Sequence, residues 1–148
     1  MVQAPVKGEV PGSSPGPAAL SQAMRVGIVG SRRRTDRWAV ERLVRSLKAS
    51  DIVVSGGCRG VDTWAVEAAD ARHMSHAEHL PALRPGMDRG EVVGAYYDRN
   101  RRIAEDCEAL YAFVAKDRTG GTENTVKWAG QLGVKVVLVP EAEEVDET

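Results

Sequence analysis

Three short turns hold the residues of this sequence that are best suited to bind an anion. The longest is Ser55–Thr63, which reads Ser-Gly-Gly-Cys-Arg-Gly-Val-Asp-Thr and lies between an apolar run and a helical pattern. Gly30-Ser31-Arg32 and Thr119–Thr122 follow two other apolar runs. A turn that opens a helix presents free backbone N–H groups and the positive end of the helix dipole, which together favour a phosphate. These turns therefore predict a site for a phosphate or a nucleotide.

Other chemistries find less support in the sequence. None of the turns is a Walker P-loop or a GxGxxG fingerprint, so ATP hydrolysis and NAD redox chemistry are poor candidates and no cofactor is expected. His76 and His79 fall on opposite faces of a strand, so no metal site is expected. The two cysteines, Cys58 and Cys107, form neither a disulfide framework nor a zinc set, which predicts a reduced, cytoplasmic protein.

The elements that must position these turns alternate along the chain. Apolar runs predict strands at residues 25–29, 51–54, 76–80, 109–114 and 134–139. Helical spacing predicts a helix after Asp36 as its cap, one at about 61–72, one from 92 or 95 to 107, and one that Gly133 ends. Alternating strands and helices predict an α/β fold, a Rossmann-like open parallel sheet of about five strands with helices on both faces.

Apolar residues at intervals of three and four predict which helix faces are buried. The predicted inward-facing residues are Val40, Leu43, Val44, Leu47, Val61, Ala65, Ala68, Ala69, Ile103, Ala104, Val126, Ala129 and Leu132. Trp38, Trp64 and Trp128 are expected in the core or at a subunit interface rather than as platforms for bases. The low aromatic content of 5% agrees with this expectation.

Composition divides the chain into three parts. Residues 1–23 are rich in Pro, Gly and Ser and are predicted to be a flexible leader. Residues 24–140 are predicted to form one domain, and residues 141–148 an acidic tail with five acids and no base. Without that tail the chain has an excess of four bases, which suits an anionic ligand. No apolar stretch is long enough to span a membrane, and no membrane partner is expected.

Four segments together resemble the SLOG superfamily, which joins the DNA-processing protein DprA (Smf) with the LOG phosphoribohydrolases. They are Val29–Arg32, Ser55–Thr63, Arg99–Arg101 and Gly120–Thr122. The Ser-Gly-Gly-x-x-Gly-x-Asp-Thr turn and the Arg-Asn-Arg sequence are most similar to DprA, and Gly-Gly-Thr is shared across the superfamily. The resemblance spans residues 25–140 and implies a Rossmann-like, nucleotide-binding domain in a small, stand-alone, homodimeric member.

The resemblance also implies a role for each matching residue. Ligands of open α/β sheets bind beyond the carboxyl ends of the strands, so the turns should form the walls of one site. Glycines admit a phosphate, arginines clamp it, and Asp62 either accepts from a ribose hydroxyl or ties its own turn together. The predicted ligand-binding residues are Gly30, Ser31, Arg32, Ser55, Gly56, Gly57, Arg59, Gly60, Asp62, Arg99, Asn100, Arg101, Gly120, Gly121 and Thr122.

These features favour a protein that binds a nucleotide or a nucleotide-derived ligand, with two alternatives. The first is a LOG-like phosphoribohydrolase that cleaves the N-glycosidic bond of a nucleoside monophosphate, with Glu123 and Arg99 as catalytic residues. Thr119 replaces the first proline of the LOG pattern Pro-Gly-Gly-x-Gly-Thr-x-x-Glu, however, and Thr125 lies nearer the position of its acid. The second alternative is DprA-like binding of single-stranded DNA in DNA processing, to which the arginines at 32–34 and Arg37 would contribute.

Overall fold

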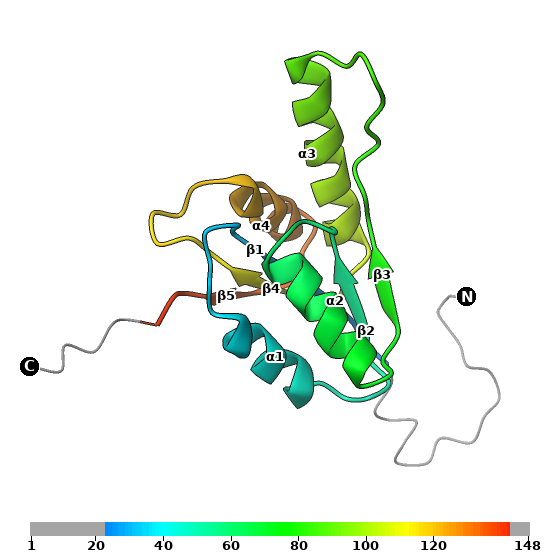
Figure 1. Cartoon of the computed structure of the whole chain (residues 1–148), viewed down its shortest axis with the longest axis vertical. Coiled ribbons are helices and arrows are strands. Elements are labelled where there is room, and N and C mark those ends of the chain that lie inside the picture. Colours follow the sequence, from blue (N-terminus) through cyan, green and yellow to red (C-terminus); the bar gives the residue numbers. More distant parts are fainter. Residues whose placement is uncertain (1–22, 143–148) are drawn as a thin grey trace, which may run out of the picture.

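A computed structural model describes residues 23–142, which form one parallel sheet with helices on both faces (Figure 1). The strands are β1 (Arg25–Gly30), β2 (Ile52–Ser55), β3 (His76–Glu78), β4 (Ala109–Phe113) and β5 (Lys135–Val139). They lie in the order β3-β2-β1-β4-β5, and every neighbouring pair is parallel. The predicted leader, apart from residue 23, and residues 143–148 of the predicted tail lie outside the described residues.

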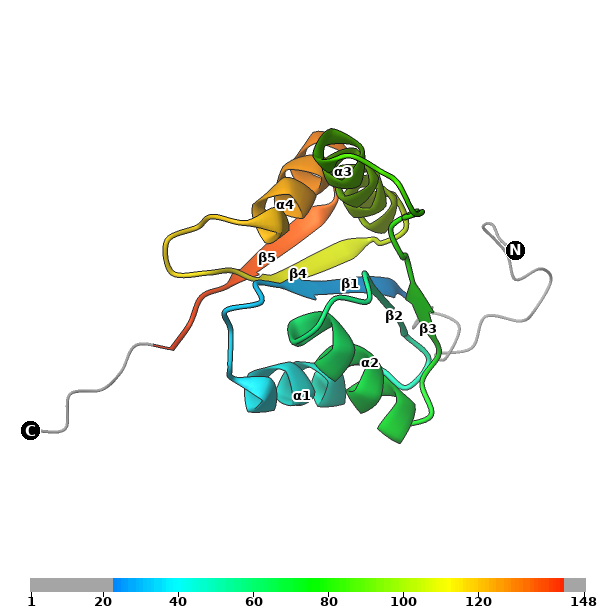
Figure 2. The same ribbon diagram turned by 45° about the horizontal axis from the view of Figure 1, so that its top comes forward.

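The four helices form two layers. Helices α1 (Arg37–Ser46) and α2 (Val61–Ala71) cover one face of the sheet, and α3 (Arg89–Glu105) and α4 (Gly121–Gln131) cover the other (Figure 2). The predicted α/β class and the Rossmann-like architecture are therefore confirmed. No helix within residues 23–142 is long and apolar enough to cross a membrane.

The core follows from the alternation of side chains along the central strands. Val26 and Ile28 of β1 are buried in one cluster with Val40 and Val44 of α1 and with Phe113 of β4. Side chains of successive strand residues point to opposite faces. The intervening positions therefore belong to the other layer.

The second cluster joins the sheet to α3 and α4. Val29, Val54 and Leu110 of the sheet are buried there with Ile103 of α3 and Ala129 of α4. Every predicted inward-facing residue except one is buried or packs against one of the two clusters. The exception is Leu132, which is exposed because α4 ends at Gln131 and the chain turns at Gly133, where φ is +76°.

Four further details differ from the predictions. The edge strand β3 is only three residues long, and both edge strands are only partly buried. Helix α3 begins at Arg89 because Asp88 and Glu91 form a capping box, a signal that the sequence contained. Asp36 occupies the N-cap position of α1 without capping it, because its carboxylate is bound by Arg34. Trp38 is 55% exposed and so does not belong to the core, whereas its alternative place at a subunit interface stays a prediction.

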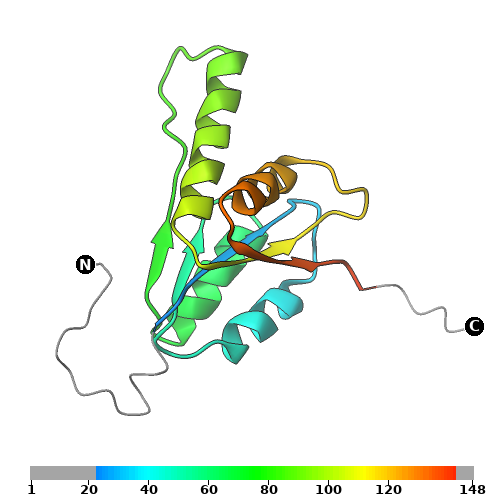
Figure 3. The ribbon, with the colours of Figure 1, turned by 180° about the vertical axis from the view of Figure 1, so that it is seen from behind.

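The strand order reverses between β1 and β4, because the chain adds strands on one side of β1 first and then on the other. The backbone N–H of Ser31, which follows β1, donates to the carbonyl oxygen of Phe113 at 2.9 Å. The carboxyl ends of both strands thus meet at one edge of the sheet. Figure 3 shows this arrangement from behind, with the N-terminal half of α3 extending beyond the sheet.

Close packing of α2 on β1 makes Gly30 intolerant of a side chain. A Cβ at Gly30 would lie 2.6 Å from the Cβ of Val61, whereas a Cβ at Gly130 in α4 would meet no atom within 4 Å. We expect Gly30→Ala to lower the free energy of unfolding by about 1–3 kcal/mol. Gly130→Ala should be neutral or stabilise by up to about 1 kcal/mol. Urea denaturation measures both, and equal effects would contradict this packing argument.

Candidate functional site

A cavity of about 270 Å³ opens at the edge where β1 and β4 end. Its walls come from the loop after β1, the turn before α2, the middle of α3 and the start of α4. This edge is the topological switch point of the sheet, where open α/β folds bind their ligands. The structure thus brings together turns that are far apart in the sequence.

The start of α4 supplies unpaired backbone donors. Gly120 precedes the helix with φ at +108°, a conformation that glycine adopts without strain. The N–H groups of Gly121 and Thr122 have no acceptor within the described residues, as is usual in the first turn of a helix. Both residues line the cavity. The helix therefore directs N–H groups and its positive dipole end to this place.

The loop before α4 is tied to the loop after β1. Arg33 donates to both carboxylate oxygens of Asp117 at 2.8 and 2.9 Å, and it donates to the Thr119 hydroxyl at 2.9 Å. This guanidinium, with the Thr119 hydroxyl, holds the pKa of Asp117 below its usual range. The contacts fix one rim of the cavity, although the residues that make them are exposed.

Asp62 organises the turn between β2 and α2 from inside. Its Oδ2 atom accepts from the backbone N–H of Gly56 at 3.0 Å and from that of Cys58 at 3.3 Å. The side chain lines the cavity, yet the residue is only 4% exposed. Burial raises the pKa of Asp62 to about 6, although these N–H groups and the positive charge of Arg99 act in the other direction.

Arg99 joins α3 to the same turn. The residue is 5% exposed, and its guanidinium donates to the carbonyl of Gly56, to Oδ1 of Asn100 at 2.9 Å and to the sulfur of Cys58 at 3.4 Å. It also lies over the ring of Tyr96, 5.3 Å from the centroid. Arg99 is therefore held in place by α3 and the β2–α2 turn before any ligand arrives.

Asn100 extends this network to α4. Its Nδ2 atom donates to Oδ1 of Asn124 at 3.1 Å and lies 3.5 Å from the carbonyl oxygen of Gly121. The residue is buried and lines the cavity beside Arg99. The Arg-Asn pair of α3 thus connects the two glycine turns on either side of it.

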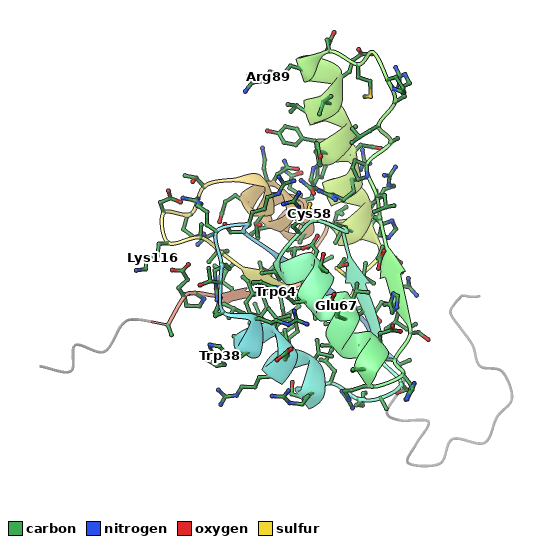
Figure 4. The ribbon with its side chains drawn as sticks, viewed as in Figure 1. Trp38, Cys58, Trp64, Glu67, Arg89 and Lys116 are labelled. Carbon is green, nitrogen blue, oxygen red and sulfur yellow. The ribbon has the colours of Figure 1, made fainter. Side chains whose placement is uncertain are left out.

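Arg32 is the cation that remains available to a ligand. It is exposed, it lines the cavity, and its guanidinium lies 3.9 Å from the sulfur of Cys58. Within residues 23–142 no carboxylate pairs with it. Figure 4 shows Cys58 where the β2–α2 turn approaches α3 and α4. Arg32 therefore lies over the middle of the site.

A second, shallower hollow adjoins the cavity and shares Arg32, Cys58 and Arg99 with it. Its other walls include the exposed Arg59 and the ring of Trp64. Trp64, which was predicted in the core or at a subunit interface, is only partly buried: it packs against the core cluster and also lines this hollow. The two hollows therefore lie next to each other at the β2–α2 turn, with Arg32, Cys58 and Arg99 between them.

Most of the predicted ligand-binding residues line one of these two hollows. The first is lined by Gly30, Ser31, Arg32, Asp62, Arg99, Asn100, Gly120, Gly121 and Thr122. The second is lined by Gly56, Gly57, Arg59 and Gly60, and again by Arg32 and Arg99. Their role in binding stays a prediction, but the fold places them together.

Three predicted residues lie elsewhere. Ser55 is fully buried, and its hydroxyl has no partner among the described residues. Arg101 points to α4, where it lies over the Trp128 ring and pairs with Glu105. The carboxylate of Glu123 is held by both donors of Arg118 at 2.7 and 2.8 Å and does not line the cavity. Thr125 lines the cavity on that helix instead, one turn deeper.

Sequence reasoning missed the contribution of Arg33, Thr119 and Tyr96. Arg33 was one of several arginines in a run, and its pairing with Asp117 joins positions 84 residues apart. No local pattern shows such a pairing. Tyr96 was detectable in principle, because it stands three residues before Arg99 on the same helix face.

Asp62 should make the stability of the domain depend on pH. Because its pKa is about 6 when folded and 3.8 ordinarily, the folded state binds more protons than the unfolded state between these values. Stability should therefore fall by up to about 3 kcal/mol as the pH rises from about 4 to about 6. The variant Asp62→Asn should lack this component. Urea denaturation of both proteins measures it, and equal pH dependence would contradict the assignment.

Comparisons with known proteins agree with this architecture. Residues 14–80 match the model of a family described as DNA recombination-mediator protein A. A comparison with curated protein sequences finds no significant match. The crystal structure of DNA processing protein A (DprA) from Streptococcus pneumoniae matches with a TM-score of 0.68 and 23% identity, over 81% of this chain and 51% of that chain. This chain thus spans about half the length of that protein.

A second structure, the C-terminal domain of a hydrogenase from Pyrococcus furiosus, matches with a TM-score of 0.47 and 14% identity, over 78% of this chain and 90% of that domain. That score is too low to support an argument. The DprA match shows the fold, and the family model covers β1, α1, β2, the glycine turn, α2 and β3. The chain is therefore similar to DprA: residues 14–80 match the family model, and the domain has the Rossmann-like fold of DprA, as the resemblance predicted.

Proposed function

We propose that this domain binds single-stranded DNA, with a backbone phosphate in the cavity at the start of α4. One observation carries the proposal. The free N–H groups of Gly121 and Thr122 and the unpaired guanidinium of Arg32 line the same cavity at the switch point of the sheet. Backbone donors at a helix start and an arginine fork are the groups that bind phosphate oxygens.

The charges around the cavity support an anionic ligand. Three arginines line it, namely Arg32, Arg33 and Arg99, and Asp62 is its one acidic residue among the described residues. Asp62 is occupied with the N–H groups of its own turn. The balance in the cavity is therefore positive, and it attracts phosphate.

The shape of the site supports a single strand rather than a duplex. The cavity is recessed, and it adjoins the hollow beside Trp64 and Arg59. A flexible single strand can place a phosphate in such a recess and a neighbouring base in the adjoining hollow, whereas a rigid duplex presents its phosphates on a convex surface. The matching family is named for DNA recombination and the protein of the matching structure for DNA processing, which supports the same ligand.

A free nucleotide is the second candidate, because the cavity volume of about 270 Å³ fits one phosphate and part of a sugar. The LOG-like hydrolase stays a prediction that the geometry does not favour. Its proposed acid, Glu123, is paired with Arg118 outside the cavity, and the uncharged Thr125 lines the cavity on the same helix. The homodimer and the cytoplasmic location also stay predictions.

A carboxylate at Gly121 should abolish DNA binding and leave the fold intact. A Cβ there would meet no atom within 4 Å, so Gly121→Asp is tolerated sterically but places a negative charge where the phosphate binds. Gly130→Asp, on the same helix with the same free space, is the matched control. We expect the first variant to lose at least about tenfold in affinity for oligothymidylate by fluorescence anisotropy, and the control to lose less than about twofold.

The same titration separates the two candidate ligands. Displacement of the oligonucleotide only by other single strands supports DNA as the ligand. Full displacement by micromolar mononucleotide, with weak binding of DNA, would favour the free nucleotide. Unchanged DNA binding by Gly121→Asp would show that this cavity does not hold the phosphate. Gly57 is a poorer test position, because φ is +75° and a Cβ would lie 2.5 Å from the Leu80 side chain.

Arg32 should contribute one phosphate contact. Replacing it with serine removes an exposed guanidinium that no carboxylate within residues 23–142 neutralises. We expect Arg32→Ser to lower the slope of log affinity against log salt by about 0.7, the value for one contact with single-stranded DNA. Lys127→Ser, which removes an exposed cation of α4, should leave the slope unchanged. Equal effects of both variants would mean that Arg32 acts only through overall charge.

A further inference from the structure

One tryptophan and two arginines form a solvent-facing stripe on α1. Trp38, Arg42 and Arg45 stand at i, i+4 and i+7, so they share one helix face, opposite the buried Val40 and Val44. Trp38 is 55% exposed, and Figure 4 shows it projecting from α1 on the side away from α2. Packing within the domain therefore does not explain why this residue is a tryptophan.

The two arginines of the stripe are not neutralised. The nearby carboxylates of Glu41 and Glu67 both bind Arg37, and Asp36 binds Arg34. Within residues 23–142 no carboxylate pairs with Arg42 or Arg45, and both are exposed. An exposed aromatic ring is thus followed on one helix face by two guanidiniums that have no carboxylate partner in the described part of the chain.

We propose that the stripe Trp38–Arg42–Arg45 is a second contact surface for single-stranded DNA, outside the cavity. A base stacks on the indole of Trp38, and the phosphates that follow it along the helix bind the guanidiniums of Arg42 and Arg45. An aromatic ring with adjacent cations is the arrangement by which proteins hold an unpaired strand without reading its sequence. This inference rests on the proposed function, because it concerns the same strand beyond the cavity.

The chain connectivity places the stripe close to the cavity. The loop after β1 contributes Ser31, Arg32 and Arg33 to the cavity, and α1 begins at Arg37, only four residues later. Trp38 is the second residue of that helix. A strand that leaves the cavity across this loop therefore reaches Trp38 first and then Arg42, while the central nucleotides remain bound at α4.

The charge of the stripe favours single-stranded DNA over an anionic membrane and over a protein partner. A helix that inserts into an anionic membrane needs a broad apolar face, and here the exposed face has one apolar residue. A protein interface of useful size has an apolar centre depleted in charge, which two free arginines beside a lone tryptophan do not provide. The stripe offers complementary charge and a stacking ring to a strand of phosphates and bases.

The test measures affinity against the length of the strand. Oligothymidylates of about 4 to 30 nucleotides are titrated into the full chain and followed by anisotropy and by tryptophan fluorescence. We expect Trp38→Ala and the double variant Arg42→Ser/Arg45→Ser to leave the affinity of the shortest strands unchanged. Each should lower the affinity of the longest strands by about fivefold or more. Lys127→Ser is the control for loss of charge, and Leu138→Ala, on the exposed edge of β5, is the control for loss of an exposed apolar side chain.

The variant Trp38→Phe tests whether Trp38 contributes through its aromatic face or through the size of its side chain. Phenylalanine keeps an aromatic face, so the affinity for long strands should stay within about twofold of the wild type. The fluorescence quenching that appears only with long strands should disappear, whereas any quenching of Trp64 beside the cavity should remain. If Trp38→Phe binds long strands fivefold more weakly but keeps the quenching that appears only with long strands, the stacking role of Trp38 is contradicted.

These variants distinguish a failure of the second contact surface from a failure of the proposed function. If Gly121→Asp abolishes binding of every length while Trp38→Ala changes none, the cavity binds DNA and the second surface is wrong. If neither variant affects binding, the proposed function itself fails. Vesicles with anionic lipid, titrated in parallel, should not quench Trp38; quenching by vesicles and none by DNA would overturn the assignment in favour of a membrane surface.

Discussion

The geometry of the site depends on one buried guanidinium. Arg99 is almost inaccessible to solvent, and a buried charge is tolerated only when its donors find acceptors and an opposite charge lies near. Here the acceptors are the Gly56 carbonyl and Asn100, and the opposite charge is Asp62. These partners belong to α3 and to the β2–α2 turn. Neither element can therefore shift without exposing the guanidinium to solvent or separating it from its partners. The cavity is therefore set before a ligand binds.

Backbone packing supplies the other constraint. Gly30 ends β1 against Val61, the first residue of α2, with no room for a Cβ. This contact brings the start of α2 directly over the end of the central strand, and the order of the strands brings the start of α4 to the same edge. Two helix N-termini thus converge because of glycine packing and topology, and the Arg99–Asn100 pair links the two glycine turns at their starts. The proposed phosphate site is therefore built from the positions of main-chain N–H groups.

The sequence predicted the fold because its patterns are local. Apolar runs and helical stripes located all five strands and all four helices, and the glycine turns located most residues that line the two hollows. Errors arose where the pairing of one side chain with another decides the outcome, whether the partner is near in the sequence or far. Asp36 looks like a cap, but Arg34 binds it, and Glu123 looks like a catalytic acid, but Arg118 binds it. Arg101 resembles Arg99, but a difference of two residues turns it to another side of the helix, toward Trp128. Pairings of this kind have no signature in one sequence.

The arginines divide into two groups that do different work. Arg34 and Arg99 are buried and bind carbonyl oxygens, so they connect parts of the fold and have no donor to spare for a large ligand. Arg32, Arg42, Arg45 and Arg59 are exposed without carboxylate partners in the described part of the chain, so they are available to an anionic ligand. Net charge counts both groups equally and therefore does not show which cations a ligand can reach. A modest excess of basic residues is compatible with nucleic-acid binding when the acids, as here, are mostly paired with arginines that hold the fold together.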